Sequence, residues 1–331
     1  MLTSEILGRV REIQVRTGRQ VADVLAGEYV SVFKGRGMEF DEVRPYVPGD
    51  DVRSIDWNVT ARTGEPHVKR YVEERQLTLM LMADVSASQD FGSSHRSKRE
   101  ATAELCALLA FTATRNDDKV GLALFHGEVE EYIPPRKGQR HALRVVREVL
   151  AHEDARASAT LGGDLVGEGG PSWRARLTAG WNRFTTGRRP RQARESTDVG
   201  HALEFLMQVT KRRTICFVVS DFLDEGFDRA MVAANRKHDV IAVLVTDPNE
   251  LAVPDAGLVA MQDAETGETR VVDTGSAAFR NEVEERATER VRALELQFAS
   301  LGIDFIHVDA AGDVVDPLVR FFRMRERRGR R

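Results

Sequence analysis

Three polar residues at alternate positions follow an apolar run: Asp84, Ser86 and Ser88. The run, residues 77–83, is almost continuously apolar, which is typical of a β-strand buried on both faces. One carboxylate and two hydroxyls at this spacing can converge on a point just beyond the end of the strand. All three are hard oxygen ligands, which suit Mg²⁺ or Mn²⁺. The segment therefore predicts one loop of a divalent-metal site.

Two other segments supply oxygen ligands in a similar context. Thr197 lies just before a predicted helix, and Asp221 ends a second apolar strand as Asp84 ends its own. In a doubly wound sheet, ligands bind beyond the carboxyl ends of the strands, where the strand order reverses. We therefore expect three loops to form one metal site, with the ligands Asp84, Ser86, Ser88, Thr197 and Asp221. Two carboxylates leave the cation able to accept a third one from an acidic residue of a protein ligand.

Two other interpretations of Asp84 stay open. The simpler one is a turn in which Asp84, Ser86 and Ser88 cap the next helix. The other is a Mg²⁺-dependent hydrolase or phosphatase with Asp84 as its nucleophile. Such enzymes need a second carboxylate two residues later as the general acid or base, and this chain has Ser86 there. We therefore expect a binding protein and no enzyme.

Strands and helices alternate over most of the chain. The pattern predicts a doubly wound, mostly parallel sheet of the Rossmann type, covered by helices on both faces. Residues 128–133 are expected to return as a hairpin from the preceding strand, and residues 257–273 to form a separate hairpin. The expected strands are 77–86, 119–125, 214–222, 240–247 and 303–309, and the expected helices are 97–116, 141–150, 197–210, 227–237 and 278–300.

Composition shifts suggest the domain boundaries. Residues 1–75 are expected to form an N-terminal segment with short helices at 3–26, then a loop-rich part with a few short strands, one at 67–74. Residues 76–318 are expected to form the α/β domain, interrupted by a flexible insertion at 151–196 that is rich in arginine. Residues 319–331 are expected to be a basic tail.

Charge and composition limit the partners and the location. The formal net charge of −4 argues against a dedicated nucleic-acid binder, although the two arginine-rich segments keep a nucleic-acid accessory role open as an alternative. Cys106 and Cys216 both lie in apolar runs and are expected to be inert buried thiols. The chain begins without a signal peptide and has no apolar stretch long enough to span a membrane. We therefore expect a soluble, cytoplasmic protein without a transmembrane segment.

The three-loop pattern resembles the metal-ion-dependent adhesion site (MIDAS) of von Willebrand factor type A domains. Asp84, Ser86 and Ser88 match its first loop, Asp-x-Ser-x-Ser, and Thr197 matches a threonine before a Gly-x-Ala-Leu helix start. Asp221 matches an aspartate at a strand end. Many such domains have a glycine after that aspartate, whereas this chain has Phe222. The resemblance implies a von Willebrand factor A fold and metal-dependent binding of a protein.

The stretch from Phe33 to Trp57 is similar to the signature of the DUF58 family, and the resemblance extends over residues 29–310. Members of that family join such a segment to a type A domain. The resemblance implies a partner, a MoxR-type AAA+ ATPase, and a chaperone-like or activating role toward other proteins. Many members carry transmembrane helices before the signature, and this sequence shows none there, which favours a soluble version.

Several residues of the signature are expected to have structural roles. Gly49 suits a turn with positive φ, and Asp50 and Asp51 suit caps. Arg53 is expected to pair with Asp56, and Trp57 to cover the sheet edge.

Overall fold

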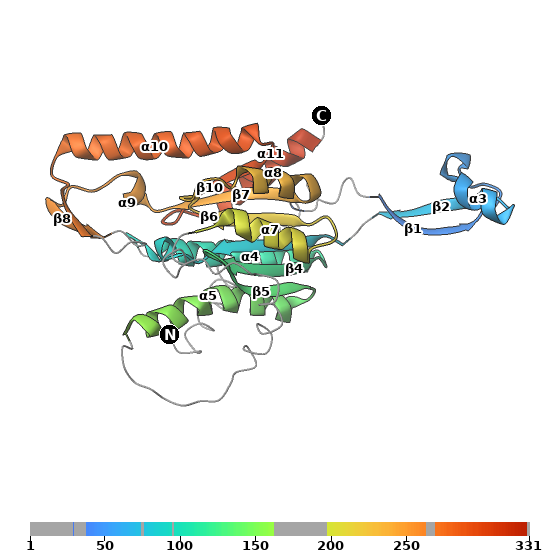
Figure 1. Cartoon of the computed structure of the whole chain (residues 1–331), viewed down its shortest axis with the longest axis horizontal. Helices are drawn as coiled ribbons and strands as arrows, with labels where there is room; N and C mark the ends of the chain where they lie inside the picture. Colours follow the sequence, from blue (N-terminus) through green and yellow to red (C-terminus); the bar gives the residue numbers. More distant parts are fainter. Residues whose placement is uncertain are drawn as a thin grey trace, which may run out of the picture.

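The computed structural model describes Tyr29 and residues 38–73, 76–94, 96–161, 197–262 and 269–329. The helices expected at 3–26 and most of the insertion expected at 151–196 lie outside these residues. Within them, the chain forms a mixed α/β domain with a projecting hairpin (Figure 1).

A six-stranded sheet forms the centre of the domain, in the order β10-β7-β6-β3-β4-β5. All neighbouring pairs are parallel except β4 and β5, which are antiparallel, as expected for a hairpin return. This confirms the predicted mixed α/β class and mostly parallel sheet. The strand order reverses between β3 and β6, which places a switch point beside Asp84. The strands are β3 (Thr78–Asp84), β4 (Lys119–Phe125), β5 (Val129–Arg136), β6 (Ile215–Ser220), β7 (Asp239–Thr246) and β10 (Asp304–Asp309).

Both faces of this sheet are buried by helices, because alternate side chains of a strand point to opposite faces. Leu79 and Leu81 of β3 belong to one apolar cluster, and Met80 and Met82 belong to the other. The first cluster is covered by α4 (Lys98–Arg115), α5 (Gln139–Leu161) and α11 (Val315–Gly329). The second is covered by α7 (Val199–Val209), α8 (Asp228–Lys237) and α10 (Ala277–Ser300).

Short-range capping places the two helices that border the switch point. Ser97 and Glu100 form a reciprocal capping box that starts α4 at Lys98. The side chain of Asp198 accepts a hydrogen bond from the backbone N–H of His201 and caps α7. The helix therefore begins at Val199, two residues after Thr197. Two single turns complete this edge of the sheet, the 3₁₀-helix η2 (Ala87–Asp90) and α9 (Pro248–Leu251).

The N-terminal segment forms a hairpin that projects away from the sheet (Figure 1). Its antiparallel strands are β1 (Met38–Pro45) and β2 (His67–Glu73), and between them lie η1 (Val52–Ser54) and α3 (Trp57–Thr63). The strand expected at 67–74 is therefore confirmed. Gly49 has a φ of 112°, as expected for its turn. Trp57 is 69% exposed, so it does not cover the sheet edge.

Ionic contacts stabilise this hairpin, with different partners from those expected. Arg44 donates two hydrogen bonds of 2.7 Å to the two carboxylate oxygens of Asp50. Asp56 caps α3 by accepting from the backbone N–H groups of Asn58 and Val59, and its carboxylate lies 3.4 Å from Lys69 Nζ. The expected Arg53–Asp56 pair is replaced in this way by a pair across to β2.

The second hairpin consists of β8 (Leu258–Gln262) and β9 (Thr269–Asp273), which pair antiparallel as expected for residues 257–273. Its turn lies outside the described residues. The helix expected at 141–150 continues as α5 through Leu161, so the first residues assigned to the insertion are helical.

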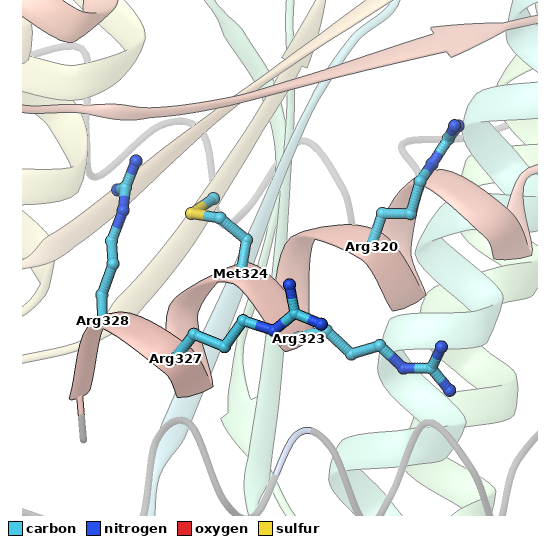
Figure 2. A pocket seen from close by; sticks show the side chains of 5 residues that line it. All are labelled: Arg320, Arg323, Met324, Arg327 and Arg328. Atoms are coloured by element: carbon cyan, nitrogen blue, oxygen red, sulfur yellow. The ribbon is translucent and has the colours of Figure 1, made fainter. Parts of the chain in front are cut away.

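The structure differs from the expectation of a basic tail from residue 319, because α11 continues to Gly329. Phe321 and Phe322 on its inner side are buried in the core, and this apolar anchorage keeps the arginine-rich part helical. Arg325 is also on the inner side, between Asp239 of β7 and Asp304 of β10. Arg320, Arg323 and Arg327 are exposed, and Arg328 pairs with Asp304 at 2.8 Å. A cavity of about 460 Å³ is lined by these four arginines and Met324 (Figure 2).

We expect Arg325→Ala to lower the free energy of unfolding by about 2 kcal/mol, because the largely buried carboxylate of Asp239 loses its cation and Asp304 keeps only Arg328. Urea unfolding followed by circular dichroism measures the loss. Arg327→Ala, an exposed position on the same helix, is the matched control and should change little. Equal effects of the two substitutions would contradict this role of Arg325.

Candidate metal centre

The structure brings the three predicted loops together at the carboxyl end of the sheet. Asp84 ends β3, Thr197 directly precedes the cap of α7, and Asp221 follows β6. All five predicted ligands are buried, and Asp84 is only 1% exposed. The switch point between β3 and β6 therefore holds a polar cluster inside an otherwise apolar sheet.

Hydrogen bonds connect the first two loops at Asp84. Its Oδ1 accepts from the backbone N–H of Ser86 at 2.8 Å, and its Oδ2 accepts from Thr197 Oγ1 at 3.3 Å. The hydroxyls of Ser86 and Ser88 lie 2.9 Å apart. Ser86 occupies the cap position of η2, yet its side chain makes no capping hydrogen bond. The simple capping interpretation therefore does not account for these two hydroxyls.

Asp84 has one further partner that the sequence did not reveal, Ser220. Strand register explains the contact, because Ala83 is the partner of Val219 and the next residues, Asp84 and Ser220, lie side by side. Ser220 Oγ donates to Asp84 Oδ2 at 2.6 Å and accepts from the backbone N–H of Phe222 at 3.0 Å. Ser220 directly precedes Asp221, and only the pairing of β3 with β6 makes it part of the site.

Asp221 interacts with the cluster in two ways, by an ion pair with Lys98 and by charge repulsion with Asp84. Asp221 Oδ2 lies 2.9 Å from Lys98 Nζ, whereas Oδ1 is buried with no hydrogen-bond partner among the described residues. The two aspartates are close enough to influence each other. Burial, and then the charge of Asp221, raise the pKa of Asp84 from its ordinary 3.8 to about 6.

A third carboxylate, Asp224, lies at the edge of the cluster. Its Oδ2 accepts from the backbone N–H of Val199 at 2.9 Å, while its Oδ1 is buried without a hydrogen-bond partner in the described part of the chain. Burial raises the pKa of Asp224 to about 7, the Val199 N–H opposes that rise, and the charge of Asp84 adds to it. Sequence reasoning missed Asp224, although its position three residues after Asp221 was a signal.

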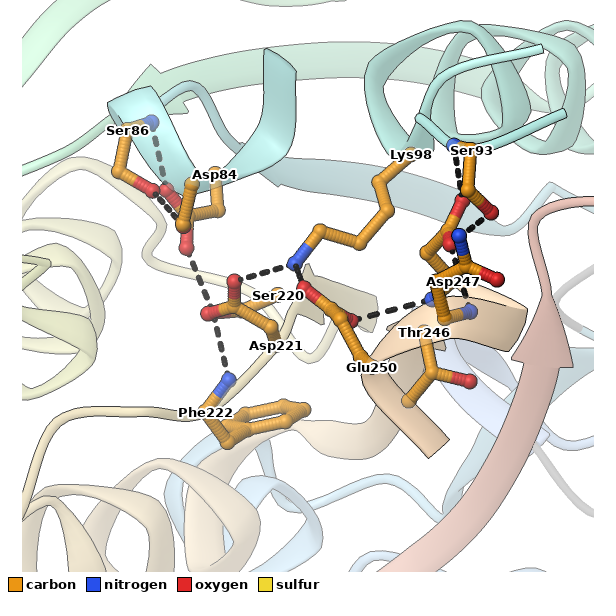
Figure 3. A network of polar contacts seen from close by, with 12 residues as sticks. Asp84, Ser86, Ser93, Lys98, Ser220, Asp221, Phe222, Thr246, Asp247 and Glu250 are labelled. Carbon is orange, nitrogen blue, oxygen red and sulfur yellow. Dashed lines mark hydrogen bonds and ion pairs between the residues drawn. The ribbon is translucent and has the colours of Figure 1, made fainter. Parts of the chain in front are cut away.

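Lys98 and Glu250 complete the polar network (Figure 3). Lys98 Nζ lies 2.6 Å from Glu250 Oε1 in addition to its contact with Asp221. Burial lowers the pKa of Lys98, but the charges of Asp221 and Glu250 outweigh this and raise it overall. No local pattern signalled either residue, because they come from α4 and α9 and meet only in the folded chain.

The donor set fits a hard divalent cation such as Mg²⁺ or Mn²⁺. Asp84, Ser86, Ser88, Thr197 and Asp221 offer only oxygen atoms, and Asp221 Oδ1 is a buried acceptor that no donor in the described residues satisfies. The described residues contain no group of three or more His, Cys, Asp and Glu side chains arranged to share a metal ion. A cation here would therefore depend on the hydroxyl oxygens as well as the carboxylates.

Phe222 follows Asp221 at the position where many type A domains have a glycine. Its φ is 50°, in the left-handed region that glycine adopts most easily. The ring packs 5.1 Å from Phe298 and 5.6 Å from Phe227, measured between ring centroids. Arg290 also donates hydrogen bonds to the backbone carbonyls of Asp221 and Phe222. These contacts offset the backbone strain and fix the loop that carries Asp221.

The raised pKa of Asp84 predicts a pH-dependent stability of the metal-free protein. Because its pKa is about 6 in the folded chain and near 3.8 when unfolded, folding is penalised above pH 6 and the penalty disappears near pH 4. This difference in pKa between the folded and unfolded chain corresponds to a destabilisation of roughly 3 kcal/mol at neutral pH. We expect Asp84→Asn to raise the free energy of unfolding by about 1–2 kcal/mol at pH 7.5 and to have little effect at pH 4.5.

Urea unfolding in the presence of a chelator, at both pH values, measures this difference. Asp316→Asn, an exposed position in the first turn of α11, is the matched control. Equal destabilisation by Asp84→Asn at both pH values would contradict the raised pKa of Asp84.

Comparison with other proteins supports a family assignment. Residues 42–293 match the family described as protein of unknown function DUF58. The uncharacterized protein Rv1480 of Mycobacterium tuberculosis is 28% identical over 324 residues, which cover 98% of this chain and 90% of that protein. The uncharacterized protein YeaD of Bacillus subtilis is 28% identical over 114 residues, covering 34% of this chain and 26% of that protein.

Solved structures give more distant similarities. The conserved hypothetical protein BatB from Bacteroides thetaiotaomicron has 14% identity and a TM-score of 0.38, with coverage of 76% of this chain and 99% of that one. An aerotolerance-related membrane protein from Bacteroides fragilis has 15% identity and a TM-score of 0.38, with coverage of 75% and 99%. A membrane-spanning protein from Vibrio fischeri has a TM-score of 0.23, with 15% identity and coverage of 74% and 95%.

These descriptions contradict the cytoplasmic location expected from the sequence, because two of the similar structures belong to proteins described as membrane proteins. That prediction is withdrawn. No helix among the described residues is long and apolar enough to cross a bilayer. The family match covers most of the chain and includes all three loops of the candidate metal centre, and the chain belongs to the DUF58 family.

Proposed function

We propose that this protein is a non-catalytic, metal-dependent protein-binding module. Asp84, Ser86, Ser88, Thr197 and Asp221 would hold a Mg²⁺ or Mn²⁺ ion, which would supply the positive charge that binds a carboxylate from a partner protein. One observation carries the proposal: the Thr197 hydroxyl donates to Asp84, 113 residues away in sequence, at the switch point of the sheet. This contact joins two of the three loops and supports the proposed site, because the MIDAS resemblance assigns one ligand to each of these loops.

The α/β domain is proposed to be a von Willebrand factor A domain with this MIDAS. Support comes from the strand order, in which β3 is central and a single antiparallel strand, β5, lies at one edge. Further support comes from the buried, unsatisfied Oδ1 of Asp221. When bound, the cation supplies positive charge and a site for an incoming carboxylate, and the chain supplies the oxygen ligands and a rigid frame.

Geometry favours binding over hydrolysis at Asp84. Its carboxylate accepts hydrogen bonds from Ser86, Thr197 and Ser220 and is almost completely buried. Hydrogen bonds from several donors lower the nucleophilicity of a carboxylate, and Ser86 occupies the position where a phosphatase would need a general acid. The same arrangement suits a ligand that only has to hold a cation.

The proposed partner is a MoxR-type AAA+ ATPase, with which the protein acts in activating or assembling other proteins. The DUF58 signature supports this partner, because family resemblance associates it with such ATPases. The projecting hairpin adds an exposed surface that suits a protein contact, including Val52 at 64% and Trp57 at 69% exposure.

We expect the protein to capture the MoxR-type ATPase of its own organism in the presence of Mg²⁺. In a chelator the affinity should fall at least about tenfold, because the cation forms the bridge. Ser88→Ala removes one neutral ligand and should weaken capture in Mg²⁺, and Asp84→Ala should abolish the dependence on Mg²⁺. Surface-immobilised protein and a titration of the ATPase give the affinities.

Asp316→Ala is the control for the loss of an aspartate, since Asp316 is exposed on α11. Circular dichroism confirms that each variant is folded. Equal capture by wild type and Asp84→Ala, with and without Mg²⁺, would refute the metal-bridged contact.

A further inference from the structure

Lys98 is a fully buried ammonium at the first position of α4. Both features are unfavourable by themselves, because burial removes the hydration of the charge and the amino end of a helix carries partial positive charge. Its position is therefore not explained by helix formation. It is explained by two carboxylates, Asp221 at 2.9 Å and Glu250 at 2.6 Å from Nζ (Figure 3).

The lysine is fixed in this position by a second layer of hydrogen bonds. Glu250 Oε2 accepts from the backbone N–H of Asp247 at 3.0 Å, so the carboxylate that shares Lys98 is itself held. Asp247 in turn accepts from the backbone N–H of Ser93 at 2.8 Å, in the loop that precedes α4. Lys98 is thus a preorganised cation and not a mobile surface side chain.

Lys98 lies where it must compete with a bound metal ion for the charge of Asp221. One oxygen of Asp221 faces Nζ and the other has no hydrogen-bond partner in the described residues, so one carboxylate serves the lysine and the proposed metal site together. Lys98 opposes part of the negative charge of Asp84 and Asp221, and the nearby carboxyl groups of Asp224 and Glu250 add to that negative charge. By making the site less negative, Lys98 leaves more of the charge of a divalent ion available to an additional carboxylate from a ligand.

We propose that Lys98 is the residue that sets the metal affinity of this site, acting as a built-in cation that keeps the binding of metal alone weak. The inference rests on the proposed metal-dependent function. It assigns to Lys98 an electrostatic role: the ammonium opposes the incoming cation, and Glu250 limits that opposition by drawing part of the lysine charge away from Asp221.

The test is a titration of Mn²⁺ alone, without partner protein, by isothermal calorimetry and by electron paramagnetic resonance of free Mn²⁺. Lys98→Met keeps the length and apolar stem of the side chain, and it should bind Mn²⁺ at least about tenfold more tightly than wild type. Glu250→Gln leaves Lys98 paired with Asp221 alone and removes one nearby negative charge, so it should bind Mn²⁺ several-fold more weakly. These opposite signs separate an electrostatic role from a general loss of structure.

Lys137→Met is the matched control. It removes the same charge from the other end of the parallel strands, where Lys137 follows β5 and pairs with Asp117. Its Mn²⁺ affinity should stay within about twofold of wild type, because Lys137 lies near the amino ends of the parallel strands and solvent and salt screen its partly exposed charge.

Each outcome decides one of the two claims. Mn²⁺ binding that requires Asp84 but is unchanged or weakened in Lys98→Met overturns the role of Lys98 and leaves the metal site intact. Binding that is equal in wild type and Asp84→Ala overturns the proposed metal site itself. Absence of Mn²⁺ binding in both wild type and Lys98→Met overturns both.

Discussion

Two buried carboxylates at the ends of neighbouring strands are the constraint on which the rest of this site depends. Asp84 and Asp221 lie on either side of the switch point, and burial, together with their mutual repulsion, raises the pKa of Asp84 to about 6. A protein core tolerates such a pair only when hydrogen bonds and opposite charges compensate for it. The surrounding residues are best understood as that compensation.

The compensation is distributed unequally between the two aspartates. Asp84 is compensated by neutral donors, the backbone of Ser86 and the hydroxyls of Thr197 and Ser220. Asp221 is compensated by a full positive charge on Lys98. Neutral hydroxyls can turn their oxygen atoms toward a cation, whereas an ammonium cannot. The Asp84 side is therefore suited to ligation, whereas Asp221 can offer a cation only Oδ1, because Oδ2 faces the ammonium.

The sheet supplies the rigidity that such a site needs. Leu79, Leu81, Met80 and Met82 fix β3 against helices on both faces, so the carboxylate at its end has little freedom to move. Phe222 fixes the third loop in the same way, by packing against Phe298 despite a left-handed backbone. The projecting hairpin and the outward arginines of α11 lie away from this frame and offer separate surfaces.

The sequence by itself determined the class of the fold and the residues of the three loops. Apolar runs such as 77–83 and 214–220 are long enough, and apolar enough, to require a sheet buried on both faces. The order of Asp84, Thr197 and Asp221 relative to strand and helix ends then located the candidate site, because carboxyl ends of parallel strands meet at one edge. Local capping signals, such as Ser97 with Glu100, also follow directly from the sequence.

Only the tertiary structure decided which charges face these ligands. Ser220 joins Asp84 through strand register, and Lys98 meets Asp221 and Glu250 across 123 and 152 residues of sequence. The arginines after residue 319 resemble a solvated tail in sequence, yet Phe321, Phe322 and Arg325 attach them to the core as a helix. Hydrophobic patterning depends on neighbours two to four residues apart along the chain, and is therefore visible in the sequence. The pairing of buried charges depends on packing between elements that are distant in sequence, so it arises only in the folded chain.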